Sequence, residues 1–338
     1  MASVLLATLI AKAVGMPNIS WAAISGYFVI RGRMTEILTR GSLRLVGTTV
    51  GALLAALLGP QILPGPMAVA CVGAFVGLLS IYGALTAQRS QAWLLFGLMF
   101  GLTLFDKYEH TDHLLREIAA GRPLQAAVGI IAAIVVGYVS SLTARRYWPA
   151  LVVPAPKAID WSSEAAARAL LGGLAILLLP WAYVAFAIPG PAQGYVTIIT
   201  AMLFPLAGAP RRSKLIATRL IQRIAGSLAG GAVAGLLILI AHGMPTLLIG
   251  GMTLSVGVGR YVENRKSQIA HGGTQFILTV LVALAADSYE QANIEPAISR
   301  LCGIFFGMTL LAAVTFTWSA VLLPTLRAIS LASFSSRS

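Results

Sequence analysis

The stretch of sequence that decides the fold reads Arg40-Gly-Ser-Leu-Arg44-Leu-Val-Gly47-Thr-Thr-Val-Gly51, and an apolar run follows it directly. The same pattern, R-x3-R-x2-G-x3-G, returns at residues 219–230, 179 positions later. Positions i, i+4, i+7 and i+11 lie on one face of an α-helix. Each copy therefore predicts a helix that starts with two arginines and continues with two glycines on the same face. Small residues at this spacing let two membrane helices approach closely. We expect such packing at Gly47, Gly51, Gly226 and Gly230.

The composition is typical of an integral membrane protein. Hydrophobic residues make up 58% of the 338 residues and charged residues only 10%, whereas soluble domains carry about 25% charged residues. The apolar runs are longer than the roughly 10-residue alternating strands of a membrane β-barrel. The sequence therefore predicts an all-α integral membrane protein.

The apolar runs divide the chain into two sets of six. They lie at residues 2–15, 18–30, 43–59, 66–86, 91–105, 124–147, 166–187, 193–207, 216–241, 245–259, 270–286 and 300–323. Pro and Gly at 16–18 and 188–191 break two of the pairs into short helices. We expect about 12 transmembrane helices, and we leave open whether 2–15 spans the membrane fully. The predicted parts are a first repeat at 1–147, a cytoplasmic linker at 148–165, a second repeat at 166–323 and a cytoplasmic tail at 324–338.

The distribution of basic residues predicts the orientation. Nineteen of the 24 Lys and Arg residues fall in loops on one side, and only four fall on the other. By the positive-inside rule both termini are then cytoplasmic. The same rule accounts for the net charge of +13 without any nucleic-acid partner.

The two halves match beyond the opening motif. Asp106-Lys-Tyr-Glu109 ends the fifth apolar segment, and Asp287-Ser-Tyr-Glu290 ends the eleventh. Arg122 and Arg300 precede the sixth and twelfth segments, each with a glycine seven residues later. Because each half has an even number of segments, the sequence predicts parallel repeats about a pseudo-two-fold axis along the membrane normal.

The four motif arginines are candidates for attracting an anionic substrate. A cluster of positive charge at the cytoplasmic mouth would raise the local concentration of an organic anion. The alternative is that these arginines anchor the helices to anionic lipid headgroups. The inner arginines lie one helical turn deeper and are therefore the better candidates for a pathway. The set comprises Arg44 and Arg223 of the inner pair and Arg40 and Arg219 of the outer pair.

Four acidic residues at the outer helix ends are candidates for proton coupling: Asp106, Glu109, Asp287 and Glu290. Carboxylates within membranes commonly serve proton relays. The alternative is that they form solvated loop edges or pair with Arg122 and Arg300.

The short second and eighth segments supply further substrate candidates. Trp21, which aligns with Tyr195 in a loose comparison of the halves, could stack on a ring-bearing substrate, although interfacial aromatic belts explain it equally well. The hydroxyls of Ser25, Thr197 and Thr200 lie midway along these segments, where they could bind a carboxylate.

Signatures of enzymes and metal sites are missing from the sequence. It contains no G-x-S-x-G, P-loop or H-E-x-x-H motif and only four histidines. We therefore expect neither an enzyme nor a bound metal or cofactor. Cys71 and Cys302 lie inside apolar runs and are predicted to be free, buried thiols.

The segment Trp21-Ala-Ala-Ile24, followed by the motif and its apolar extension over residues 40–55, resembles the fusaric-acid-resistance / aromatic-acid-exporter family of bacterial inner-membrane proteins. It is more distantly similar to the plant aluminium-activated malate channels. The resemblance covers nearly the whole chain as two six-helix units. It implies export of aromatic carboxylic acids or related toxic compounds, often beside a periplasmic adaptor and an outer-membrane channel. Larger members carry cytoplasmic domains after each unit, and we expect a short form without them.

These observations together predict an inner-membrane efflux transporter for organic anions. We expect its path to lie between the halves and the proton motive force to drive it. Two alternatives remain: a passive anion channel, and a non-transporting membrane subunit that scaffolds an envelope assembly. The sequence leaves a homo-oligomer open.

The predicted topology can be tested with single cysteines in a variant that lacks Cys71 and Cys302. A cysteine at Ser213 should react with an impermeant reagent from the cytoplasmic side, and one at Gln291 from the outer side, because the basic loops lie inside. Reaction of both from the same side would contradict the twelve-helix topology.

Overall fold

The computed structural model describes residues 1–30, 32–63, 65–109, 115–143, 161–187, 189–203, 209–265, 269–285 and 294–318, with side chains of the 209–265 segment described from 218. These residues form twelve helices and no strand, which confirms the all-α class. The first half holds α1 (Ala2–Ala13), α2 (Ile19–Val29), α3 (Met34–Ile62), α4 (Pro66–Thr86), α5 (Ser90–Glu109) and α6 (Leu115–Leu142). The second half holds α8 (Ser163–Phe186), α9 (Pro191–Met202), α10 (Ala209–Ala241), α11 (Pro245–Asn264), α12 (Ala270–Leu284) and α13 (Glu295–Thr317).

Six of these helices are long and apolar enough to cross a membrane: α3, α4, α6, α8, the Thr218–Ala241 part of α10, and α13. Helices α1, α2 and α12 are apolar but shorter, and α9 has only 12 residues. A hydrocarbon core needs about 20 residues for a perpendicular crossing. The number of full crossings therefore remains a prediction.

Residues with positive φ separate α1 from α2 and precede α9. Gly15 (φ 67°) and Asn18 (φ 55°) separate α1 from α2, and Gly190 (φ 80°) immediately precedes α9. Pro191 then opens α9, at a position where its missing N–H leaves no hydrogen bond unmade. The breaks that the sequence predicts before α2 and α9 are thus confirmed, except that residue 188 lies outside the described residues.

The glycines of the repeated motif bring two pairs of helices into backbone contact. A methyl group added at Gly47 or Gly51 of α3 would meet the carbonyl oxygen of Ala92 or Phe96 on α5. Gly226 and Gly230 of α10 lie in the same way against the carbonyls of Gly272 and Phe276 on α12. The pairs α3–α5 and α10–α12 are therefore packed more closely than any side chain at these positions would allow.

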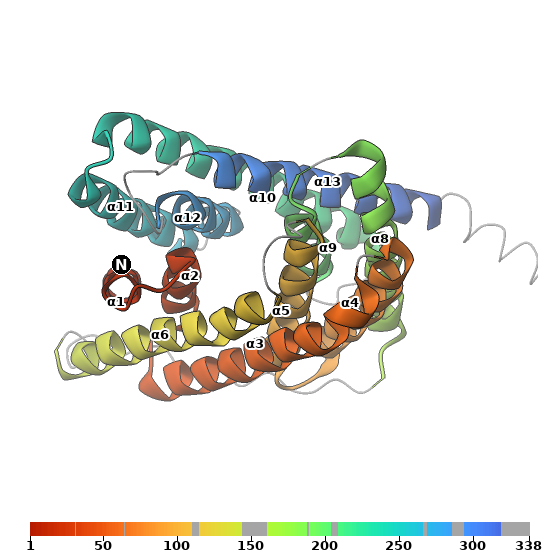
Figure 1. The fold of residues 1–338 in the computed structure, drawn as a ribbon, viewed down its shortest axis with the longest axis horizontal. Coiled ribbons are helices and arrows are strands. Elements are labelled where there is room, and N and C mark those ends of the chain that lie inside the picture. The colour runs from red at the N-terminus through yellow and green to blue at the C-terminus, as the bar shows by residue number, and fades with distance from the viewer. Residues whose placement is uncertain are drawn as a thin grey trace, which may run out of the picture.

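The buried core has two main parts, and each part mixes helices from both halves (Figure 1). One part joins α1 and α2 to α10, α11 and α12, on the left of the figure. The other joins α4 and α5 to α8 and α9, on the right. The first two helices of each half thus pack against the fourth and fifth helices of the other half.

Three expectations from the sequence need correction. Arg122 and Arg300 lie inside α6 and α13 rather than in loops, because these helices begin at Leu115 and Glu295, before their apolar runs. Helix α8 begins at Ser163, ahead of the apolar run at 166. Cys71 is exposed and Cys302 only partly buried, because both face outward from helices whose other faces are packed.

Replacing Gly226 with Ala should lower the free energy of unfolding by about 1–3 kcal/mol, the usual cost of overpacking. The added methyl group would displace the carbonyl of Gly272. Gly250 of α11 is the matched control, because nothing lies within 4 Å of a Cβ placed there and alanine is the better helix former. Thermal unfolding in detergent measures both variants. Equal stability of the two would show that the glycine contact is dispensable.

Candidate functional site

The inner motif arginines are buried inside the protein. Arg44 is 5% exposed and Arg223 is 4% exposed, whereas Arg40 and Arg219 are intermediate. Each inner arginine shares a helix face with the glycines that pack on α5 or α12, so it is turned inward with them. This burial favours a role inside the protein over anchoring to lipid headgroups.

Arg219 has a separate position at the end of α9. Its Nη1 donates a hydrogen bond of 3.0 Å to the carbonyl oxygen of Leu203, the C-cap residue of α9. A positive charge at a helix C-terminus is favourable because the last carbonyls carry partial negative charge. Arg219 therefore holds α10 to the end of α9.

The inner arginines bind the hydroxyl groups of the short helices. Arg223 donates from Nη1 to Thr200 Oγ1 at 2.9 Å and from Nη2 to Thr197 Oγ1 at 3.1 Å. Arg44 donates from Nε to Ser25 Oγ at 3.0 Å. The three hydroxyls expected to receive a carboxylate thus lie beside the arginines and accept their hydrogen bonds.

A second pair of buried arginines, which the sequence did not place in the site, lies beside the first. Arg300 of α13 is 6% exposed and donates to Gln193 Oε1 at 2.9 Å and to Gln275 Oε1 at 3.3 Å. Arg122 of α6 is 7% exposed. It pairs with Asp106 at 3.3 Å, and its guanidinium lies 4.7 Å from the centre of the Trp21 ring.

The glycines that follow Arg122 and Arg300 show how the two halves correspond. Gly129 packs against the carbonyl of Ala22, and Gly307 packs against that of Gly194. On this register, Trp21, Ser25 and Phe28 of α2 correspond to Gln193, Thr197 and Thr200 of α9. The loose alignment of Trp21 with Tyr195 was therefore wrong by two residues.

The arginine contacts agree with this corrected register. In the first half Arg122 stacks on Trp21, and at the corresponding position of the second half Arg300 binds Gln193. Arg44 binds Ser25 where Arg223 binds Thr197. Both halves therefore hold two buried arginines against the same face of a short helix.

The two halves differ in how these charges are compensated. Among the described residues, the only carboxylate in an ion pair with one of the four buried arginines named above is Asp106, in the first half. Arg223 and Arg300 lie close enough for the charge of one to act on the other. A buried, unneutralised charge is costly. Among the described residues, Arg223 and Arg300 therefore have neutral partners, whereas Arg122 has a carboxylate.

The acidic candidates have different surroundings. Asp106 pairs with Arg122, which was the alternative drawn from the sequence. Glu109 Oε1 accepts a hydrogen bond of 2.8 Å from the backbone N–H of Gly190, the N-cap residue of α9. A carboxylate is favourable at a helix N-terminus. Asp287 and Glu290 lie outside the described residues.

A polar bridge between the halves was missed by sequence reasoning. Tyr27 of α2 donates a hydrogen bond to Glu263 Oε2 of α11. Arg260 donates to the same oxygen at 2.8 Å and lies 5.4 Å from the centre of the Tyr27 ring. The only sequence signal was the position of Arg260 and Glu263 one turn apart, which predicts a local ion pair but no partner from α2.

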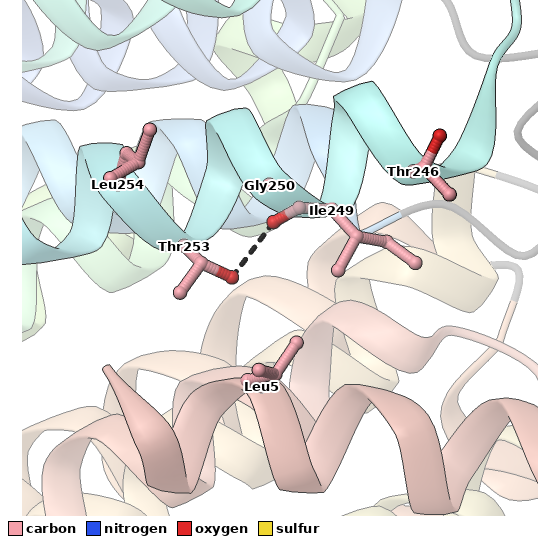
Figure 2. A pocket seen from close by; sticks show the side chains of 6 residues that line it. All are labelled: Leu5, Thr246, Ile249, Gly250, Thr253 and Leu254. Carbon is pink, nitrogen blue, oxygen red and sulfur yellow. Dashed lines mark hydrogen bonds between the residues drawn. The ribbon is translucent and has the colours of Figure 1, made fainter.

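An apolar hollow lies elsewhere among the described residues. It has a volume of about 470 Å³ between α1 and α11 and is lined by Leu5, Thr246, Ile249, Gly250, Thr253 and Leu254 (Figure 2). The one hydrogen bond drawn there joins Thr253 to the carbonyl of Ile249 within α11. This lining is apolar and contains none of the buried arginines, so the hollow is suited to lipid or another apolar group rather than to an anion.

No group of three or more potential metal ligands is found among the described residues. His110 and His113 lie outside them.

Comparison with known proteins gives one family. A family model described as fusaric acid resistance protein-like matches residues 6–136 and 181–315. The two matched segments contain most of the two halves, and with them Arg44, Arg122, Arg223 and Arg300. Comparison with curated proteins and with solved structures gives no match.

The difference between the halves predicts opposite effects of the same substitution. Arg300→Gln should raise the free energy of unfolding by about 1 kcal/mol or more, because it removes one of two like charges buried together. Arg122→Gln should lower it, because Asp106 loses its partner and Trp21 loses a cation–π contact of about 0.5–2 kcal/mol. Thermal unfolding in detergent without organic anions measures both. Loss of stability in both variants would contradict the difference in compensation.

Proposed function

Because the chain belongs to the fusaric acid resistance protein-like family, we propose that it exports organic anions from the cytoplasm across the bacterial inner membrane. The chain is a multi-pass integral membrane protein, and its family comprises membrane transporters related to fusaric acid resistance. Aromatic carboxylates or related toxic compounds are the proposed cargo. Both termini are proposed to be cytoplasmic.

The observation that carries the proposal is the burial of Arg223 and Arg300 beside each other with no carboxylate of the described residues paired to either. A membrane protein that served only as a scaffold would gain nothing from two buried guanidinium groups that no carboxylate of the described residues neutralises, because such groups are expensive to remove from water. A carboxylate cargo compensates this charge while it is bound. Guanidinium groups also offer two parallel hydrogen bonds to a carboxylate.

The proposed path lies between the two halves. Helices α2 and α9, which carry the partners of the buried arginines, each pack against helices of the other half. A rearrangement of one half against the other would therefore change the surroundings of these short helices directly. Transporters built from repeats commonly place the substrate at the interface of the repeats.

The proposed drive is the proton motive force, and Glu109 is the acidic candidate best connected to the anion site. Glu109 binds the N-terminus of α9 from the other half, and α9 carries Gln193, Thr197 and Thr200. A proton on Glu109 removes the negative charge from that contact and weakens it. Loosening this contact at the start of α9 would shift the whole 12-residue helix, and with it the Gln193, Thr197 and Thr200 side chains that bind the arginines. Asp106, Asp287 and Glu290 remain candidates for the same role.

Two alternative functions differ from an exporter in what moves the anion. A passive channel would conduct anions according to voltage alone, and a scaffold would move none. The proposed partners of the exporter are a periplasmic adaptor and an outer-membrane channel, and a homo-oligomer is compatible with the proposal.

Transport of fusarate by the purified protein in proteoliposomes distinguishes the three functions. An imposed pH gradient with the membrane potential clamped should drive fusarate transport by the wild type. In Glu109→Gln, the increase in the rate of fusarate transport caused by the pH gradient should be at least several-fold smaller, because residue 109 can then no longer take up a proton. Glu117→Gln is the matched control, since Glu117 is exposed on α6. Movement that follows voltage alone would identify a channel, and no movement under either condition would identify a scaffold.

A further inference from the structure

We infer that the chain holds one anion site rather than two equivalent ones. The site lies in the second half, where Arg223 and Arg300 bind the carboxylate of the cargo, and the first half fills the corresponding place with its own Asp106. This inference rests on the proposed function and specifies the substrate-binding part of it.

The second-half site is built from four helices, and in the described part of the chain the hydrogen-bond partners of its two arginines are all uncharged. Arg223 comes from α10 and Arg300 from α13. Thr197 and Thr200 of α9 hold the first, and Gln193 of α9 holds the second. Gln275 of α12, which is 3% exposed, also accepts from Arg300. The pair is thus fixed in position by neutral groups.

Both guanidinium groups keep donor capacity in this arrangement. Their Nη atoms bind the threonines and glutamines, but the Nε–H of Arg223 and that of Arg300 have no acceptor among the described residues. The Nε and Nη1 of Arg122 in the first half also lack an acceptor there, so it is the neutral lining that distinguishes the second half. A buried donor without an acceptor costs about 1–3 kcal/mol. A carboxylate has two oxygens that accept hydrogen bonds and a negative charge that offsets the repulsion between the arginines. These needs favour an organic carboxylate over a neutral ligand.

The first half has the same framework with different chemistry at three positions. Trp21 and Phe28 stand where Gln193 and Thr200 stand in the second half. The contacts of Gly47 and Gly226 show in the same way that Leu95 of α5 corresponds to Gln275. Three of the four polar residues of the second-half site therefore have apolar counterparts in the first half, and the fourth, Thr197, corresponds to the hydroxyl of Ser25.

The first-half arginines also have partners of their own. Arg122 is paired with Asp106 and stacked on Trp21. The guanidinium of Arg44 lies 5.6 Å from the centre of the Phe28 ring and binds Ser25. The carboxylate of Asp106 supplies the negative charge that the second half would receive from the cargo. An external anion would therefore have to displace Asp106 to bind in the first half.

Binding of fusarate and of benzoate to the purified full-length protein tests this inference by titration calorimetry in detergent. Wild type should bind one anion per chain. Arg300→Gln and Arg223→Gln should weaken the affinity for the anion more than tenfold. Arg300→Lys should weaken it less, because lysine keeps a positive charge at this position. The matched first-half changes, Arg122→Gln and Arg44→Gln, should alter the affinity less than threefold. Equal losses from both halves, or two anions per chain, would overturn the inference.

A second variant addresses the acidic residue that the sequence pairs with Asp106. Asp287→Asn should leave the affinity for fusarate unchanged within twofold. A marked gain in affinity would mean that Asp287 occupies the second-half site as Asp106 occupies the first, and would overturn the asymmetry. Size-exclusion profiles and unfolding temperatures show that each variant is folded.

The two proposals can fail separately. Anion binding that depends on Arg223 and Arg300, without fusarate transport in proteoliposomes, would contradict the proposed export function but support the binding site. Fusarate transport that is unaffected by Arg300→Gln would support the export function but contradict the proposed binding site.

Discussion

The coupling of arginine and glycine on one helix face is the constraint on which the rest of the structure depends. Gly47 lies three residues after Arg44, and Gly226 lies three residues after Arg223. The glycines must face α5 and α12, because only there can the backbones touch. The arginines share that face, so close helix packing and burial of positive charge come together. A membrane protein cannot leave such a charge unsupported, which explains the polar groups that α2 and α9 present to it.

The short helices α2 and α9 supply the side chains that bind the buried arginines. Each begins after a residue with positive φ and lies against the sixth helix of its own half through Gly129 or Gly307. Each also contacts the other half, α2 through the bridge from Tyr27 to Glu263 and α9 through the bond from Gly190 to Glu109. The groups that hold the arginines are thus on the elements most directly exposed to any movement between the halves.

Much of this arrangement could be predicted from the sequence. The features that could not be predicted were missed for physical reasons. The duplicated motif predicts the helices and their shared face, because its spacing is helical and its residue types are distinctive. Arg300 was placed in a loop because its apolar run begins only at the charge, although α13 starts five residues earlier. The register of α9 against α2 was missed because both are short apolar helices with no charged landmark. The partner of Glu263 was missed because Tyr27 lies 236 residues away along the chain.

The exchange of helices between the halves has a consequence for how the protein is made. Helices α4 and α5 pack on each other, and α5 also packs on α3, but their core cluster is completed only when α8 and α9 have been synthesised. Helices α1 and α2 must wait longer still, for α10 to α12. Domains that fold as independent units can do so while the ribosome is still working, but neither of the two main core clusters is complete within one half of this chain. The first six helices must therefore be held in the bilayer as an unfinished assembly until the second six arrive.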